Sequence, residues 1–141
     1  MVSVIIPTLN EQETIAAVVQ SAFLCDKVTE VLVIDDKSVD DTVALAKKAG
    51  AKVFASSRLG KGASMREGIL LAKNEILLFI DGDIHPYPKN MMELLIAPII
   101  NDECDFVKSS FTRNAGRVTE LVAKPLLSIF FPELTGFDQP L

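Results

Sequence analysis

The sequence predicts an α/β protein in which helices cover both faces of a mostly parallel sheet. Short apolar runs rich in valine and isoleucine recur along the chain, amphipathic stretches separate them, and polar residues follow their ends. Parallel strands buried on both faces read as continuous apolar runs, and alternation with helices is typical of such sheets. The predicted strands are residues 2–6, 31–34, 52–55, 76–80 and the pair Phe106–Val107.

Capping signals define the first two predicted helices. Asn10 is followed three residues later by Glu13, which resembles a capping box and predicts a helix over residues 11–24. Ser38 is predicted to cap the second helix, and Gly50 ends it. These two helices connect the first three strands.

Three further helices complete the alternating pattern. A loop with Gly60 and Gly62 precedes the third helix, and residues 90–100 form the fourth, which Pro98 kinks or ends. A last helical pattern begins near Val118. Strands and helices thus alternate about five times, with no repeat or linker between them.

Composition indicates one folded domain over residues 1–141, since 49% of the residues are hydrophobic and 23% are charged. The formal net charge of −5 argues against nucleic acid as a partner. The chain opens with no basic leader, and no apolar run reaches the roughly 18 residues of a membrane span, so a cytoplasmic protein is expected. Cys25 and Cys104 are too few for a disulfide framework or a zinc site, and both are predicted to be buried thiols.

The carboxyl ends of the strands are the expected ligand-binding region, because ligands of open parallel sheets bind outside these ends. Several chemically useful side chains follow the predicted strands. They are Thr8, Asn10, Glu11, Asp35, Asp36, Asp81, Asp83 and the loop 109–117. The fold is expected to gather these four loops into one site.

The sharpest local feature is Asp81-Gly82-Asp83, directly after the strand 76–80. Two carboxylates so close repel each other unless a cation or hydrogen-bond donors lie between them, and carboxylates suit Mg²⁺ and Mn²⁺. Gly82 lets a phosphate approach the backbone closely. The alternative is an ordinary acidic turn, since Asp and Gly are turn residues.

Two other segments have a functional and a structural interpretation. Asp35-Asp36 can hydrogen-bond a ribose or a base, or it can cap the helix that follows. Lys61, between two glycines, can place its ammonium on a phosphate, although the spacing of a P-loop is missing. Its alternative role is that of a solvated lysine in a turn.

A basic segment of small residues, 113–119, precedes the last helical pattern. Free amides at the start of a helix bind anions, and Arg117 adds a fork of donors. The alternative is a surface loop with solvated arginines. His85 is the only histidine, and without a serine or cysteine partner motif it makes a hydrolase triad improbable.

Four segments follow one another in a specific order: VSVIIPTLNE (2–11), VIDDKSVDDT (33–42), GKG (60–62) and FIDGD (79–83). Together they resemble the motifs of the nucleotide-sugar glycosyltransferase superfamily with the GT-A fold, which is Rossmann-like. The last segment corresponds to the metal-binding Asp-x-Asp of that superfamily.

The distal part of the chain narrows the resemblance. The segments 116–121, 124–127, 130–134 and 139–141 are similar to glucosyl-3-phosphoglycerate synthases, with mannosyl-3-phosphoglycerate synthases as close alternatives. The family implies transfer of a sugar from a nucleoside diphosphate to the 2-hydroxyl of 3-phosphoglycerate, with retention at the anomeric carbon. It also implies a Mg²⁺ or Mn²⁺ cofactor.

The resemblance implies roles for individual residues, although no catalytic residue is assigned. Asp83 binds the metal, and Asp81 supports the metal or the nucleotide. The nucleotide-binding residues are Pro7, Thr8, Leu9, Asn10, Glu11, one acid of the pair Asp35-Asp36, Lys61, Asp81 and Gly82. The residues that cradle the phosphate and carboxylate of the acceptor are Gly116, Arg117, Val118 and Thr119.

The distal end departs from the family, whose members are longer and carry a histidine metal ligand that His85 does not match. The expectation is therefore donor binding with weak or absent transfer by this chain alone. The apolar segment 126–131 is expected to pack on the sheet, a further segment or a second copy of the chain. Two alternatives remain, a nucleotide-sugar-binding module without transfer and a polyprenyl-phosphate glycosyltransferase.

Overall fold

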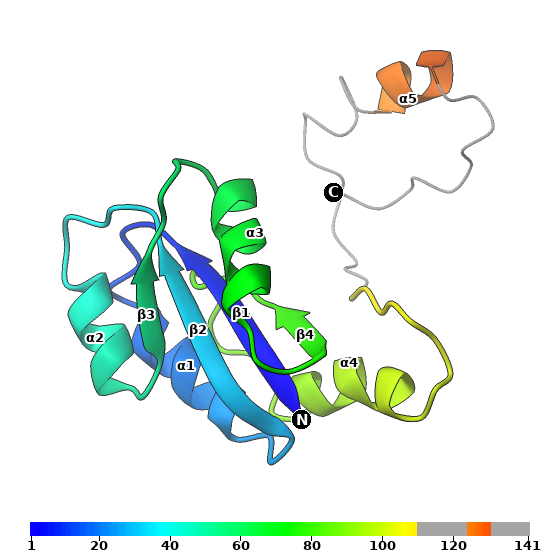
Figure 1. Ribbon diagram of the computed structural model, residues 1–141, viewed down its shortest axis with the longest axis horizontal. Coiled ribbons are helices and arrows are strands. Elements are labelled where there is room, and N and C mark those ends of the chain that lie inside the picture. The colour runs from blue at the N-terminus through cyan, green and yellow to red at the C-terminus, as the bar shows by residue number, and fades with distance from the viewer. Residues whose placement is uncertain (110–123, 131–141) are drawn as a thin grey trace. The chain divides into compact units, whose positions relative to one another are not determined.

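The computed structural model describes residues 1–109 and 124–130 (Figure 1). The chain divides into two units, residues 1–107 and 108–141. The first unit contains β1 (Val2–Thr8), α1 (Ile15–Phe23), β2 (Val28–Asp35), α2 (Thr42–Lys48), β3 (Lys52–Ala55), α3 (Lys61–Leu71), β4 (Ile76–Phe79) and α4 (Met91–Ile100).

The sheet is entirely parallel, with the strand order β3-β2-β1-β4. The chain runs outward from β1 through β2 to β3 and then crosses back to β4, on the other side of β1. The strand order therefore reverses between β1 and β4. Such a switch point opens a crevice at the carboxyl ends of the two strands, where ligands bind.

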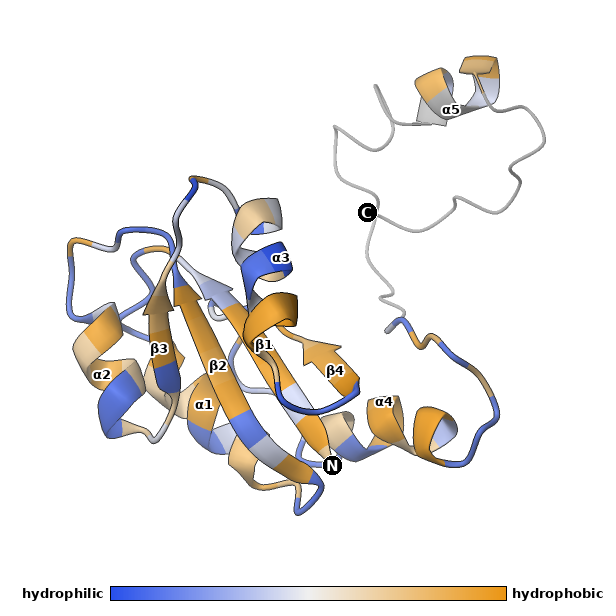
Figure 2. Cartoon of the chain, viewed as in Figure 1, coloured by the Kyte–Doolittle hydropathy of each residue, from blue (hydrophilic) through white to orange (hydrophobic). Residues whose placement is uncertain are grey.

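Alternating side chains of β1 face two separate layers. Val4 and Ile6 belong to the core that includes α1, α2 and α4, whereas Ile5 belongs to the opposite face. A Cβ on Gly68 of α3 would lie 2.4 Å from Ile5 Cγ2, so α3 packs directly on that second face. The predicted α/β sheet with helices on both faces is confirmed, and its strands are mostly hydrophobic in Figure 2.

The predicted helix starts at Asn10 and Ser38 are wrong. The helix α1 begins at Ile15 and α2 at Thr42. Asn10 has a left-handed backbone (φ 56°), and its Oδ1 accepts a hydrogen bond from the backbone N–H of Val39. Ser38 Oγ in turn accepts from the backbone N–H of Asn10. Both side chains link two loops to each other, so neither is free to cap a helix.

The predicted strand at Phe106–Val107 is also absent, and the side chain of Phe106 is 79% exposed. Two apolar residues between Asp105 and Lys108 are too few to bury a face of a sheet. Cys104 lies exposed in the same loop and corrects the prediction of two buried thiols.

Other expectations hold. Cys25 is buried in the core, and Pro98 lies inside α4, which ends two residues later. In the second unit, α5 (Lys124–Phe130) confirms a helix in the described part of the last predicted pattern. The apolar side chains of Leu126 and Ile129 are exposed there. No helix within residues 1–109 and 124–130 is long and apolar enough to cross a membrane.

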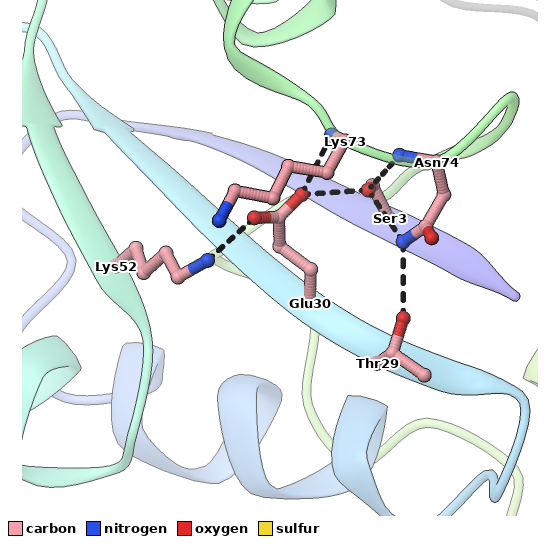
Figure 3. A network of polar contacts seen from close by, with 6 residues as sticks. All are labelled: Ser3, Thr29, Glu30, Lys52, Lys73 and Asn74. Carbon is pink, nitrogen blue, oxygen red and sulfur yellow. Dashed lines mark hydrogen bonds and ion pairs between the residues drawn. The ribbon is translucent and has the colours of Figure 1, made fainter.

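A buried polar network closes the end of the sheet where β1 begins (Figure 3). Glu30 is 4% exposed and accepts hydrogen bonds from Ser3 Oγ (2.8 Å), Lys52 Nζ (2.7 Å) and the backbone N–H of Lys73 (3.0 Å). Asn74 Nδ2 donates to Ser3 Oγ (3.0 Å). Burial raises the pKa of Glu30, but these donors outweigh it and hold the pKa below the usual 4.5. The network ties the segment between α3 and β4 to β1 and β2.

Candidate functional site

A pocket of about 370 Å³ lies at the opposite end of the sheet, at the switch point between β1 and β4. The end of β1 with the loop after it, the residue after β2, the start of α3 and the turn after β4 contribute to it. Its lining residues are Pro7, Thr8, Leu9, Glu11, Asp36, Gly60, Lys61, Ser64, Asp81, Gly82 and Asp83. Loops far apart in the sequence thus meet where the sequence predicts a ligand site.

The loop after β1 is held in place by the loop after β2. The backbone N–H of Glu11 donates to Thr42 Oγ1 (2.7 Å), and the backbone N–H of Asn10 donates to Ser38 Oγ (2.9 Å). Asn10 Oδ1 accepts from the backbone N–H of Val39 in return (2.9 Å). These bonds fix the backbone that carries Thr8 and Glu11 into the pocket.

The Asp81-Gly82-Asp83 turn is held by two hydroxyl groups that the sequence analysis did not assign. Thr14 Oγ1 donates to the carbonyl of Gly82 (2.7 Å), and Tyr87 Oη donates to the carbonyl of Asp81 (2.9 Å). Burial, together with the charge of Asp81, raises the pKa of Tyr87 to about 12, so the phenol keeps its proton. Both residues position the two carboxylates.

The space beside Gly82 is occupied by Glu11. A Cβ on Gly82 would lie 1.8 Å from Glu11 Oε2 and 3.0 Å from Thr8 Cγ2. No larger residue fits there without displacing one of these side chains. The glycine therefore allows a carboxylate from the β1 loop to approach the β4 turn.

Negative charge dominates this side of the pocket. Burial, followed by the charges of Asp83 and Asp81, raises the pKa of Glu11 from 4.5 to about 7. Lys61 Nζ forms an ion pair with Asp81 Oδ1 and offsets part of this charge. Three carboxylates and one ammonium thus surround the mouth of the β1–β4 crevice.

Four buried side-chain oxygens have no hydrogen-bond partner among the described residues. All four belong to residues that line the pocket: Thr8 Oγ1, Glu11 Oε2, Asp36 Oδ1 and Ser64 Oγ. Buried polar groups in native proteins are almost always hydrogen-bonded, and exceptions require an explanation. The pocket therefore offers four oxygens whose hydrogen-bonding capacity is unused among the described residues.

The acids of the β4 turn fit a divalent cation that is shared with a ligand. Within the described part of the chain, no three acidic, histidine or cysteine residues lie close enough together to hold an ion by themselves. Asp81 and Asp83 nevertheless offer carboxylate oxygens on one short turn beside the pocket. Mg²⁺ is usually held by one or two carboxylates and completed by substrate phosphates, and this partial donor set suits that mode.

The structure brings most of the predicted site residues together but separates two of them. Asn10 does not line the pocket, and Asp35 is 5% exposed with its Oδ2 accepting from the backbone N–H of Ser38 (3.1 Å). Asp36 is the acid of the pair that reaches the pocket. The predicted acceptor residues Gly116, Arg117, Val118 and Thr119 lie outside the described residues.

Ser64 is a pocket residue that the sequence pattern does not predict. The one available signal was its position on a helix: it lies three residues after Lys61 and four before Gly68, which packs on the sheet. Thr14 and Tyr87 gave no signal, because their partners are backbone carbonyls, which any residue type provides.

Comparison with known proteins gives a consistent result over nearly the whole chain. The model of glycosyl transferase family 2 matches residues 3–138. The glucosyl-3-phosphoglycerate synthase of Petrotoga mobilis is 36% identical over 165 residues, a match that covers 99% of this chain and 51% of that enzyme. The synthase of Mycobacterium tuberculosis is 35% identical, over 99% of this chain and 51% of its own length.

Solved structures agree with these relatives. A crystal structure of the Mycobacterium tuberculosis glucosyl-3-phosphoglycerate synthase, in complex with Mn²⁺, UDP-glucose and phosphoglyceric acid, has a TM-score of 0.85 and 38% sequence identity. The match covers 100% of this chain and 54% of that one. A complex of the same enzyme with Mn²⁺, UDP and glucosyl-3-phosphoglycerate has a TM-score of 0.83. The chain spans about half the length of the relatives it matches.

Proposed function

The chain belongs to glycosyl transferase family 2, and we propose that its pocket binds a nucleoside diphosphate sugar, UDP-glucose, for transfer of glucose to 3-phosphoglycerate. The observation that carries the proposal is the set of four unpartnered oxygens around the acidic pocket at the β1–β4 switch point. The relatives support the choice of sugar, base and acceptor, because the related enzyme was crystallised with UDP-glucose and phosphoglyceric acid.

The nucleoside is proposed to lie against the β1 side of the pocket. Pro7 and Leu9 supply apolar surface there, Thr8 supplies a buried hydroxyl, and Asp36 supplies a carboxylate oxygen. Apolar walls with a few fixed polar groups are typical of small-molecule sites. The residues therefore hold a ring that has both an apolar face and a polar edge.

The diphosphate is proposed to lie at the β4 turn. Asp83 would hold Mn²⁺ or Mg²⁺ directly, and Asp81 would support it. A bound divalent ion there neutralises the charge that develops on the departing diphosphate. Lys61, which pairs with Asp81 and also lines the pocket, would add a positive charge beside the same phosphates. Glu11 adds a third acid to the same end of the pocket, on the side of Gly82.

The acceptor site is proposed on sequence alone. Small residues and the guanidinium of Arg117, in the segment 116–119, suit the phosphate and carboxylate of 3-phosphoglycerate. Replacement of Arg117 by alanine is expected to raise the KM for 3-phosphoglycerate and to leave the affinity for UDP unchanged.

Calorimetric titration with UDP and UDP-glucose, in Mn²⁺ and in a chelator, tests the donor site. Tighter binding in Mn²⁺ is expected. An assay of labelled glucose transfer from UDP-glucose to 3-phosphoglycerate then tests the reaction. Donor binding without transfer would leave a nucleotide-sugar-binding module. Absence of nucleoside diphosphate binding in any metal would contradict the proposal.

A further inference from the structure

Ser64 lies in the first turn of α3 with its side chain completely buried. Its hydroxyl has no hydrogen-bond partner among the described residues, and the residue lines the pocket. Gly68, one turn later on the same face of the helix, is packed against Ile5 of β1. Ser64 is thus a fully buried residue in the wall of the pocket, on a helix that packs closely on the sheet.

Backbone hydrogen bonds connect the first turn of α3, which carries Ser64, to Asp36. The backbone N–H of Ser64 donates to the carbonyl of Gly60 (3.2 Å), and the N–H of Gly60 donates to Asp36 Oδ2 (2.7 Å). The second oxygen of that carboxylate, Oδ1, is buried without a partner. Gly60 thus links the backbone of the first turn of α3 to Asp36, and both Ser64 and Asp36 line the pocket with an unpartnered oxygen.

The charge of Asp36 decides which part of a nucleotide this group can accept. A phosphate beside the unpaired Oδ1 would be repelled, because two anions at short range in a partly buried site raise each other's free energy. The neutral nucleoside carries N–H and O–H donors for a carboxylate and oxygens that accept from a hydroxyl. The diphosphate is proposed to lie beside Asp81, Asp83 and Lys61, where a divalent cation offsets the charge of the acids.

We propose that Ser64 is a nucleoside-binding residue of the donor site, whose hydroxyl hydrogen-bonds the base or ribose that Asp36 also contacts. The inference rests on the proposed function, since it assigns a contact within the same pocket. It explains why a helix that packs closely on the sheet buries a hydroxyl that has no partner within the described protein.

The test compares the wild-type chain with Ser64→Ala by calorimetric titration in Mn²⁺. Two probes are used: UDP, which carries the nucleoside, and inorganic pyrophosphate, which does not. Loss of one hydrogen bond predicts about a three- to tenfold weaker affinity for UDP and an unchanged affinity for pyrophosphate. The Tm of the free variant should not fall, because the hydroxyl has no hydrogen-bond partner among residues 1–109 and 124–130.

Ser21→Ala is the matched control. Ser21 is also a helical serine, but its hydroxyl donates to the carbonyl of Ala17 within α1, and it does not line the pocket. This variant should bind both probes as the wild type does. The same control shows whether the removal of any helical hydroxyl perturbs binding.

Three results would overturn the inference alone. They are an affinity of Ser64→Ala for UDP equal to that of the wild type, a loss of affinity for pyrophosphate equal to the loss for UDP, and weaker UDP binding accompanied by a lower Tm. The second result would indicate that Ser64 contacts the phosphates, and the third that its role is structural. Failure of the wild-type chain to bind UDP, read before any variant is made, would instead contradict the proposed function and the inference with it.

Discussion

The two ends of strands β1 and β2 carry the same kinds of side chain in opposite states. At one end, Ser3 and Glu30 are buried and hydrogen-bonded to each other. Lys52 Nζ and the backbone N–H of Lys73 donate further hydrogen bonds to the Glu30 carboxylate. At the other end, Thr8 is buried and Asp36 partly so, and each keeps an oxygen without a partner among the described residues. Both sets of polar side chains lie on or next to β1 and β2, so the two ends differ in whether these side chains have hydrogen-bond partners.

This difference separates stability from binding. A buried polar group without a partner costs free energy, whereas a satisfied one does not. The satisfied end is therefore expected to stabilise the fold, and the unsatisfied end to lower stability until a ligand binds. Substitutions should divide in the same way: those near Ser3 and Glu30 change unfolding, and those around the pocket change binding.

The largest effect is expected from Asp83→Ala at the unsatisfied end. If this carboxylate holds the metal that the diphosphate shares, its loss should weaken UDP binding in Mn²⁺ about 100-fold, at the upper end of effects seen for metal-site residues. Binding in a chelator should change little. Isothermal titration calorimetry in both conditions measures the metal dependence directly.

Asp26→Ala is the control for this variant, because Asp26 is exposed in the turn between α1 and β2 and does not line the pocket. It should keep the full metal dependence. If Asp83→Ala also kept it, the Asp81-Gly82-Asp83 segment would be only an acidic turn, and the comparison between the two ends would lose its functional half.

At the satisfied end, Glu30→Gln is expected to lower the free energy of unfolding by about 2 kcal/mol, since hydrogen bonds to a charged group contribute roughly 1.5–3 kcal/mol. The Tm should fall by roughly 5–10 °C, while the affinity for UDP stays unchanged. Because the folded pKa of Glu30 is lowered, its stabilising contribution is present above pH 4.5 and is lost as the pH falls through that lower pKa.

Thermal unfolding of wild type and Glu30→Gln between pH 3 and pH 8 measures this difference. The gap in Tm should be widest near neutral pH and should narrow in acid. Ser3→Ala, which removes one donor to the same carboxylate, should show a smaller loss in the same direction. Weaker UDP binding by either variant would show that the two ends are coupled.

Two glycine substitutions, Gly82→Ala and Gly62→Ala, are expected to change stability in opposite directions. In Gly82→Ala the new methyl group would collide with Glu11 and crowd Thr8, so a loss of about 1–3 kcal/mol in stability is expected. In Gly62→Ala the methyl group meets nothing within 4 Å, and the helical position should gain up to about 1 kcal/mol. Chemical denaturation of both variants measures the difference.

The size of the stability loss in Gly82→Ala depends on whether the Glu11 side chain can move aside. If Glu11 moved aside freely, Gly82→Ala would unfold at the same denaturant concentration as the wild type. Adding Glu11→Ala to Gly82→Ala should recover part of the lost stability, because the double variant removes the collision.

The sequence predicts the sheet and the pocket acids for one physical reason. Three apolar runs are long enough to be recognised as strands from the sequence: 2–6, 31–34 and 76–80. The positions of Asp36, Asp81 and Asp83 follow from where the second and third of these strands end. Local patterns thus determine both the element and the side chain that comes directly after it.

What the sequence cannot predict is contact between distant segments. Asn10 looked like a helix cap because its true partner, Val39, lies 29 residues away. Thr14 and Tyr87 hold the β4 turn through backbone carbonyls, which leave no pattern in the sequence. Phe106 looked like a strand by composition, yet it finds no partner strand in the described part of the chain. Side-chain identity alone carries no information on these pairings.

The smallest expected effect is a pH-dependent gain in stability from Glu11→Gln, measured without nucleotide and in a chelator. Burial and the neighbouring Asp83 and Asp81 raise the folded pKa of Glu11 to about 7. Between pH 4.5 and 7 the folded chain therefore holds a proton that the unfolded chain has released, so stability falls as the pH rises through this range. A neutral glutamine removes that loss. The Tm of the variant should equal that of the wild type near pH 4 and exceed it at pH 8.

Glu13→Gln is the matched control, since Glu13 is exposed two residues away on the same loop. It should follow the wild type at every pH. A lower Tm for Glu11→Gln at pH 8 would mean that the charged carboxylate already has a stabilising partner in the free protein. Glu11 would then resemble Glu30, whose charge is stabilised by hydrogen bonds. The two ends of the sheet would no longer differ in stability as the unpartnered oxygens of the pocket indicate. A higher Tm at pH 8 would show that the free fold carries this acid at a cost in stability.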